Sequence, residues 1–138
     1  MSTDALHFSC VAIGGRAVLI EGPSGAGKSD LALRLIDRGA VLVSDDYTIL
    51  TDVDGVLIAS APATIAGRIE IRGVGIVAMD HVSPAPVALL VELAEGVERL
   101  PVPTSRRLRG VAVPVVALNA HEASAPIKVE LALGRATA

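Results

Sequence analysis

The stretch Gly22-Pro23-Ser24-Gly25-Ala26-Gly27-Lys28-Ser29 carries the strongest signal for the fold of this 138-residue chain. It follows the apolar run 17–20 and precedes residues 28–38, whose apolar side chains recur at steps of three and four. This order predicts a buried strand, a glycine-rich loop and one short amphipathic helix. The stretch also fits the phosphate-loop pattern of Gly, four residues and Gly-Lys-Ser, in which Lys28 reaches outer phosphates and Ser29 ligates Mg²⁺. The alternative is a structural turn with a solvated lysine.

Two carboxylates follow the next predicted strand. Gly39 ends the helix, and residues 40–43 are apolar on both faces, as in a strand of a parallel sheet. Asp45 and Asp46 then stand at the carboxyl end of this strand, where α/β sheets bind ligands, if the strand is a parallel neighbour of 17–20. One carboxylate would hold Mg²⁺ and the other would accept a proton, although a simple Asp-Asp turn gives the same pattern.

The rest of the chain favours short strands, so we predict an α/β, β-rich fold with one main helix after the phosphate loop. The expected strands are 5–13, 48–51, 56–60, 68–72, 87–93 and 111–118, with a hairpin turn at 52–55 and further β-rich sequence at 127–133. Residues 101–110 contain two prolines and Arg106-Arg107-Leu108-Arg109, which indicates an exposed loop. We expect one domain over residues 1–138.

The pattern alone does not decide the role of the charged segment 68–72 or of His7. Strict alternation in Arg68-Ile69-Glu70-Ile71-Arg72 puts the charged side chains on one face, which is either a solvated edge or the wall of a phosphate site. His7 lies on the predicted first strand, where a partly buried structural histidine is the better interpretation from the residues alone. No role is assigned to His81 or His121.

Composition excludes several classes of function. Phe8 and Tyr47 are the only aromatic residues, and a net charge of -3 offers no basic track, so nucleic acid is not an expected partner. No apolar run approaches the roughly 20 residues of a membrane span, and no secretory signal opens the chain. The one cysteine, Cys10, forms no intrachain disulfide. We therefore expect a soluble cytoplasmic protein without a membrane partner.

Four segments together resemble the catalytic domain of the bacterial HPr kinase/phosphorylase family. They are His7, the loop from Gly22 to Ser29 followed by Asp30, the segment from Arg38 to Asp46, and Glu70-Ile-Arg-Gly-Val-Gly75, which resembles the family signature. Glu98-Arg99-Leu100 is a weaker match. The resemblance implies a phosphate-loop fold similar to phosphoenolpyruvate carboxykinase.

The resemblance also implies roles for single residues. Lys28 and the loop amides would bind ATP, and Ser29 and Glu70 would hold Mg²⁺. One of Asp45 and Asp46 would act as the base toward a serine of HPr, the small phosphocarrier protein of the sugar phosphotransferase system, and His7 and Arg99 would assist at the phosphate.

Three departures from the family pattern refine these expectations. Only six residues precede His7, where full-length members carry a separate N-terminal domain, and Ala138 comes before the usual C-terminal helices, so we expect a form that resembles the truncated proteobacterial one. Leu118-Asn-Ala-His-Glu-Ala-Ser124 stands where the family has Pro-Gly-Arg-Asn, a stretch linked to dephosphorylation. We expect an Mg-ATP-dependent HPr kinase, and leave open its reverse phosphorylase activity and a homo-oligomer. The alternatives are a phosphotransferase acting on a small molecule and a non-catalytic module that responds to ATP.

Overall fold

The computed structural model describes residues 4–136. Within them the chain forms eleven strands and two helices, in the order β1 (Ala5–Leu6), β2 (Ser9–Ile13), β3 (Arg16–Glu21), α1 (Lys28–Asp37), β4 (Val41–Ser44), β5 (Thr48–Val53), β6 (Val56–Ser60), β7 (Arg68–Ile71), β8 (Gly75–Ala78), β9 (Ala85–Leu93), β10 (Thr104–Leu108), β11 (Val111–Leu118) and α2 (Ala125–Ala136). The mixed, β-rich α/β class is confirmed, and the glycine-rich loop 22–27 lies between β3 and α1 as predicted.

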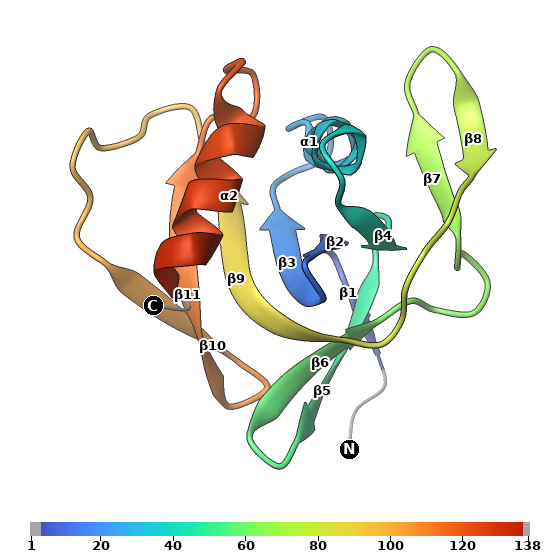
Figure 1. Ribbon diagram of the computed structural model, residues 1–138, viewed down its shortest axis with the longest axis horizontal. Helices are drawn as coiled ribbons and strands as arrows, with labels where there is room; N and C mark the ends of the chain where they lie inside the picture. Colours follow the sequence, from blue (N-terminus) through green and yellow to red (C-terminus); the bar gives the residue numbers. More distant parts are fainter. Residues whose placement is uncertain (1–3, 137–138) are drawn as a thin grey trace.

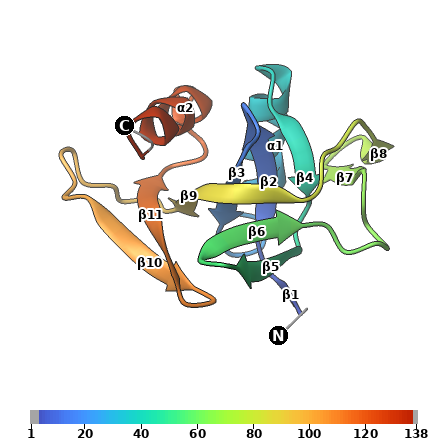
Figure 2. The same ribbon diagram turned by 60° about the horizontal axis from the view of Figure 1, so that its bottom comes forward.

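The long strand β9 organises the main sheet (Figure 1). Its first residues pair antiparallel with β6, and the rest of the strand pairs in parallel with β3 on one side and β11 on the other. The order along the sheet is β1-β5-β6-β9-β3-β2-β4, with β11 and then β10 branching from β9. Because β9 turns from one set of partners to another, the sheet curls, and the β5–β6 hairpin lies across the start of β9 (Figure 2).

The two faces of the curled sheet bury two apolar clusters. Side chains alternate along each strand, so Val18 and Ile20 of β3 join the cluster beneath the helices, whereas Ala17 and Leu19 join the cluster on the opposite face. The first cluster contains residues of α1, α2 and β7, and the second contains residues of β5, β6 and β11. Both faces of β3 are therefore covered by apolar side chains. This packing holds the strand in place where the glycine-rich loop begins.

Helix α1 forms where its periodicity predicts it. Leu31, Ala32 and Leu35 are fully buried against the sheet, as expected for apolar residues at steps of three and four. The helix is also tied to α2, because the guanidinium of Arg38 donates two hydrogen bonds to the Glu130 carboxylate, at 3.1 and 2.7 Å. The Arg38 guanidinium holds the pKa of Glu130 below its ordinary value.

The sequence favoured β4 as the parallel neighbour of β3, and this prediction is wrong. Strand β4 runs in the same direction as β3 but does not pair with it, because β2 lies between them and pairs antiparallel with both. The predicted strand 5–13 is also divided. Ala5 and Leu6 pair with β5, and only Ser9–Ile13 form the hairpin with β3. The break places His7 and Phe8 between two strands. The hairpin at 52–55 is confirmed, with Asp54 and Gly55 as its two turn residues.

The prediction of an exposed loop over residues 101–110 is wrong for residues 104–108. Residues 104–108 form β10, which pairs antiparallel with β11 through a two-residue turn at Arg109 and Gly110, both with positive φ. One of the two arginines of this strand, Arg106, is ion-paired. It donates hydrogen bonds to Glu21 at 2.7 Å and to Glu92 at 3.0 Å. These carboxylates raise the pKa of Arg106, and the three side chains join the ends of β3 and β9 to β10.

The β-rich prediction for 127–133 and the prediction of one main helix are also wrong, because this segment lies within α2. Its apolar residues alternate in sequence, which favours a strand, but the structure buries Ala125, Val129 and Leu133, which are spaced by four. Pro126 lies in the first turn of the helix. Backbone N–H groups there have no partner within the helix, so the N–H that proline lacks costs no hydrogen bond. In the described part of the chain, neither helix is long and apolar enough to cross a membrane.

Two substitutions in α2 test this helical assignment. Leu131 and Leu133 would share a face in a strand, but in the helix Leu133 is 1% exposed and Leu131 is 66% exposed. We expect Leu133→Ala to lower the free energy of unfolding by about 2–5 kcal/mol, and Leu131→Ala to change it by less than about 0.5 kcal/mol. Urea unfolding of the two variants measures the difference. Equal losses would contradict the helix.

Candidate functional site

The glycine-rich loop wraps closely against its surroundings. A Cβ on Gly22 would lie 3.0 Å from Ala26 Cβ and 3.2 Å from Leu93 Cβ, and a Cβ on Gly27 would lie 3.2 Å from Ala120 Cβ. Gly27 also has φ 99°, in the left-handed region that glycine tolerates. Close contact with the end of β9 and the segment after β11 therefore disfavours a side chain at both positions, and the backbone conformation favours glycine at Gly27 as well.

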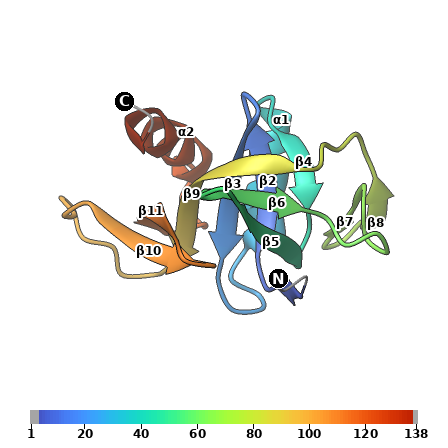
Figure 3. The ribbon, with the colours of Figure 1, turned by 90° about the horizontal axis from the view of Figure 1, so that it is seen from below.

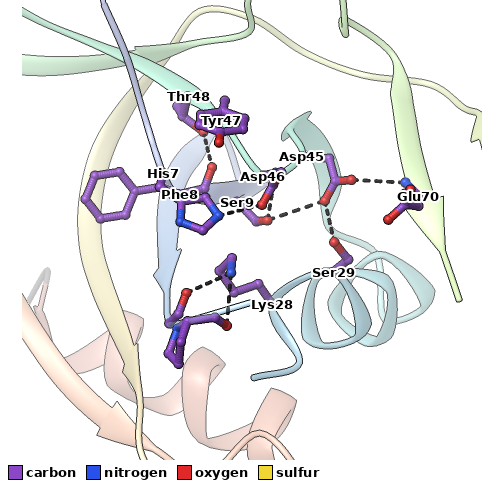
Figure 4. Close-up of polar contacts among 12 residues, drawn as sticks. His7, Phe8, Ser9, Lys28, Ser29, Asp45, Asp46, Tyr47, Thr48 and Glu70 are labelled. Carbon is purple, nitrogen blue, oxygen red and sulfur yellow. Dashed lines mark hydrogen bonds and ion pairs between the residues drawn. The ribbon is translucent and has the colours of Figure 1, made fainter. Parts of the chain in front are cut away.

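Lys28, the first residue of α1, is folded back over this loop. Its side chain is almost fully buried, and Nζ donates hydrogen bonds to the carbonyl oxygens of Gly22 at 2.7 Å and of Pro23 at 3.3 Å (Figure 4). These acceptors are neutral, and within residues 4–136 no carboxylate forms an ion pair with this ammonium group. An anion at the N-terminus of α1 would gain both this charge and the positive end of the helix dipole.

Asp45 is the most heavily hydrogen-bonded side chain in this part of the protein. Oδ1 accepts a hydrogen bond from Ser29 Oγ at 2.6 Å and a longer one from Ser9 Oγ at 3.4 Å, and Oδ2 accepts one from the backbone N–H of Glu70 at 3.0 Å (Figure 4). The residue is only 8% exposed. The carboxylate therefore connects the first turn of α1, β2 and β7, which are far apart in sequence.

Asp46 has a different environment from its neighbour. Its Oδ1 lies 2.8 Å from His7 Nε2, and its side chain is 52% exposed. The backbone has φ 67°, an uncommon conformation for a residue with a side chain. The Asp46 N–H donates to Ser9 Oγ at 3.0 Å, and the ring of Tyr47 packs against the imidazole of His7 with centroids 5.2 Å apart. The histidine is thus an exposed partner of a carboxylate, which differs from the partly buried structural role expected from pattern alone.

The charged face of β7 lines the same cavity as the loop. This cavity has a volume of about 920 Å³ and separates the start of α1 from the β7–β8 hairpin. It contains the predicted site residues Ser24, Gly25, Gly27, Lys28, Ser29, Asp45, Asp46 and Glu70. Arg68, Glu70 and Arg72 line this cavity and are also exposed to solvent, so both interpretations of this face stay predictions.

The structure does not bring every predicted residue to this cavity. Arg99 is exposed in the segment between β9 and β10 and does not line this cavity, so its role stays a prediction. Pro23 and Ala26 line a second cavity of about 380 Å³ beside the loop, and His7 reaches the first cavity only through Asp46.

Sequence reasoning missed several residues that line the first cavity, namely Tyr47, Thr64, Ile65, Ile76 and His121. Tyr47 follows the acidic pair and carries one of the two aromatic rings in the chain, which is a usable signal. His121 has no such signal, because 92 positions separate it from Ser29.

Cys10 does not take part in this arrangement. Cys10 is fully buried in β2, and burial raises the pKa of its thiol, so it is not a nucleophile at neutral pH.

Among residues 4–136, no three His, Cys, Asp or Glu side chains converge as a preformed metal site. A metal ion here would need oxygen ligands from a bound molecule as well as from the protein.

Known proteins share this sequence and architecture. Residues 1–84 match the family model described as HPr serine kinase C-terminal domain. The HPr kinase/phosphorylase of Clostridium beijerinckii is 47% identical over 72 residues, 52% of this chain and 24% of that protein. The protein of the same name from Geobacillus sp. is 49% identical over 78 residues, 56% of this chain and 25% of that protein. The chain thus spans about a quarter of the length of these relatives.

A solved structure extends the match to nearly the whole chain. The HPr(Ser) kinase/phosphatase of Coxiella burnetii superposes with a TM-score of 0.83 at 30% sequence identity. The match covers 95% of this chain and 94% of that one.

The two aspartates are expected to differ in their effect on stability. Asp45→Ala leaves the Glu70 N–H and the Ser29 hydroxyl without their acceptor, and we expect it to lower the free energy of unfolding by about 1–3 kcal/mol. Asp46→Gly removes an exposed side chain at a positive φ, and we expect the free energy to stay within about 0.5 kcal/mol or to rise. Thermal and urea unfolding measure both. A larger loss for Asp46→Gly would show that the His7 pair is a structural requirement.

Proposed function

This chain belongs to the HPr serine kinase C-terminal domain family, and we propose that it transfers the γ-phosphoryl group of ATP to a serine hydroxyl of HPr in the cytoplasm, with Mg²⁺ as cofactor. One observation supports this most strongly. The cavity that contains the ammonium-bearing residue of the loop, Lys28, is also lined by the carboxylate that pairs with His7, Asp46. A phosphate-binding group and a proton acceptor therefore face the same space, as phosphoryl transfer requires.

In this proposal the glycine-rich loop is a phosphate loop. Its backbone N–H groups and the start of α1 bind phosphate oxygens, and Lys28 exchanges the carbonyl oxygens of Gly22 and Pro23 for them. A charged acceptor offers the lysine a stronger interaction than a carbonyl does. Arg68 and Arg72 line the opposite wall and add positive charge toward the transferring group.

The donor set also fits Mg²⁺. The Ser29 hydroxyl donates its proton to Asp45 at 2.6 Å, so its oxygen lone pairs remain available, and Glu70 lines the same cavity with a carboxylate. Hydroxyl and carboxylate oxygens are ligands that Mg²⁺ prefers, completed by phosphate oxygens and water. Ser29 and Glu70 would hold the ion, which supplies charge neutralisation between the phosphates.

We assign the base to Asp46 and not to Asp45. Both oxygens of Asp45 already accept hydrogen bonds, one from a backbone N–H that cannot turn away, so this carboxylate is committed to holding Ser29 and β7. The Asp46 side chain is half exposed, and among the described residues its carboxylate has a hydrogen bond only with His7. The serine Oγ–H proton passes to Asp46 as the Oγ–P bond forms and the bond from the γ-phosphorus to the bridging oxygen of ADP breaks. His7 orients the carboxylate.

The defining experiment offers acceptors in parallel. The protein is incubated with Mg²⁺ and γ-labelled ATP, together with purified HPr, with HPr whose phosphorylatable serine is replaced by alanine, or with small hydroxyl and carboxyl compounds. We expect label on wild-type HPr alone. Label on a small molecule would instead support a different phosphotransferase. Turnover no faster than that of Lys28→Ala with every acceptor would support a non-catalytic module. Adding inorganic phosphate and phosphoserine-HPr tests the phosphorylase activity, in which phosphate attacks the phosphoserine phosphorus and releases HPr with its free serine and pyrophosphate.

Replacement of the proposed base separates chemistry from binding. We expect Asp46→Asn to lower kcat for HPr by about three orders of magnitude or more, with nucleotide affinity kept within about tenfold, because the amide cannot accept the seryl proton. The matched control is Asp80→Asn, an exposed aspartate outside the cavity, which should leave both quantities unchanged. Parallel loss of binding and turnover in Asp46→Asn would make the residue structural.

Replacement of the proposed metal ligand should act through the ion. Glu70→Gln keeps the backbone N–H that donates to Asp45 but removes a carboxylate charge, so we expect the Mg²⁺ concentration at half-maximal rate to rise by about tenfold. A magnesium titration of kinase activity measures the shift. An unchanged titration would show that Glu70 does not ligate the ion.

A further inference from the structure

The two connections that carry His7 and Tyr47 meet at one end of the main sheet. β1 pairs with β5 and β2 pairs with β4, so the chain between β1 and β2 lies against the chain between β4 and β5. Figure 3 shows β1, in dark blue, beside β5. His7 and Asp46, which are 39 positions apart in the sequence, thereby come into contact.

The turn that carries Tyr47 is ordered by its own hydrogen bonds. The Tyr47 backbone N–H donates to the carbonyl oxygen of Asp45 at 2.7 Å, and its carbonyl oxygen accepts a hydrogen bond from Ser44 Oγ. The next residue, Thr48, donates from Oγ1 to the carbonyl oxygen of Phe8 at 2.8 Å, directly after the histidine. Because the backbone is ordered on both sides, the tyrosine and histidine rings are held side by side before any acceptor binds.

The imidazole of His7 has few other restraints. Among residues 4–136 its only hydrogen bond joins Nε2 to Asp46 Oδ1 at 2.8 Å, and its side chain is 40% exposed. An ionised carboxylate only accepts hydrogen bonds, so Nε2 carries the proton in this pair. One hydrogen bond does not fix the plane of the ring. The Tyr47 ring supplies the second contact, with centroids 5.2 Å apart and an angle of 30° between the planes.

We propose that Tyr47 is a positioning residue for phosphoryl transfer, an inference that rests on the proposed function with Asp46 as the base. The tyrosine ring limits rotation of the imidazole, and the imidazole in turn holds the Asp46 carboxylate toward the serine proton. Tyr47 and Asp46 both line the cavity of about 920 Å³, whereas His7 does not line it. Loss of an aromatic contact of this kind corresponds to a rate change of about two- to tenfold.

Two substitutions of Tyr47 test this role. Tyr47→Leu keeps an apolar side chain but removes the ring, and we expect kcat for HPr to fall by about three- to tenfold while the KM for HPr and the Kd for ATP change by less than about twofold. Tyr47→Phe retains the ring, so it should keep kcat within about twofold of wild type. Steady-state kinetics with purified HPr measure kcat and KM, and urea unfolding establishes that each variant is folded.

A double-mutant cycle with His7 shows whether Tyr47 acts through the imidazole. We expect His7→Ala to lower kcat on its own. Adding Tyr47→Leu to His7→Ala should then lower kcat by less than about 1.5-fold further, because the imidazole that the ring holds is gone. The loss caused by Tyr47→Leu would thus depend on His7.

Several results would overturn the inference. They are an unchanged kcat in Tyr47→Leu, a loss of the same factor with and without His7, a raised KM for HPr at unchanged kcat, and a loss in Tyr47→Phe as large as that in Tyr47→Leu. The raised KM would make Tyr47 a contact for the acceptor, and the loss in Tyr47→Phe would assign the effect to the hydroxyl. All of these leave the proposed function standing, whereas a wild-type protein that transfers no label to HPr would overturn the proposed function together with this role.

Discussion

The hydrogen bonds of the Asp45 carboxylate are the constraint on which the site depends. One buried side chain accepts hydrogen bonds from the start of α1, from β2 and from the backbone of β7. β7 pairs only with β8 in a small sheet separate from the main one, and Ile69, Ile71 and Val77 pack this sheet on the core. The Asp45 carboxylate adds a direct polar link between β7, which carries Glu70, and the start of α1, which carries Lys28.

Adjacent aspartates acquire opposite roles because the backbone turns between them. Asp45 is buried directly after β4, and Asp46 enters a left-handed conformation that turns its side chain outward to His7. Ser9 stabilises both, since its hydroxyl contacts the Asp45 carboxylate and accepts the Asp46 N–H. An uncommon backbone conformation beside a cavity is typical of functional sites, where local strain is retained for geometry. The pair is therefore a structural acid followed by an exposed one, which is consistent with Asp46 as the proposed base.

Sequence reasoning succeeded where the signal is local and failed where packing selects between two periods. The helix over 28–38 and the hairpin at 52–55 are specified by neighbouring residues, and both are present. Residues 127–133 alternate like a strand, yet α2 forms because residues spaced by four bury against β9 and β11 while Ile127 and Leu131 stay exposed. Likewise, the arginines of β10 favour an exposed loop in the sequence, whereas in the structure Arg106 forms ion pairs with Glu21 and Glu92.

By itself, the sequence determined the loop, the helix that follows it and the order of the acidic residues, because each depends on residues within a few positions of one another. It also determined the family resemblance, because that rests on the order and spacing of four short motifs. Only the tertiary structure decided which aspartate is buried, that β2 separates β3 from β4, that the charged face of β7 lines a cavity, and that His121 lies across the loop from β7. These features arise from pairing between strands that are distant in sequence and from side chains competing for a limited interior, and no local pattern encodes either.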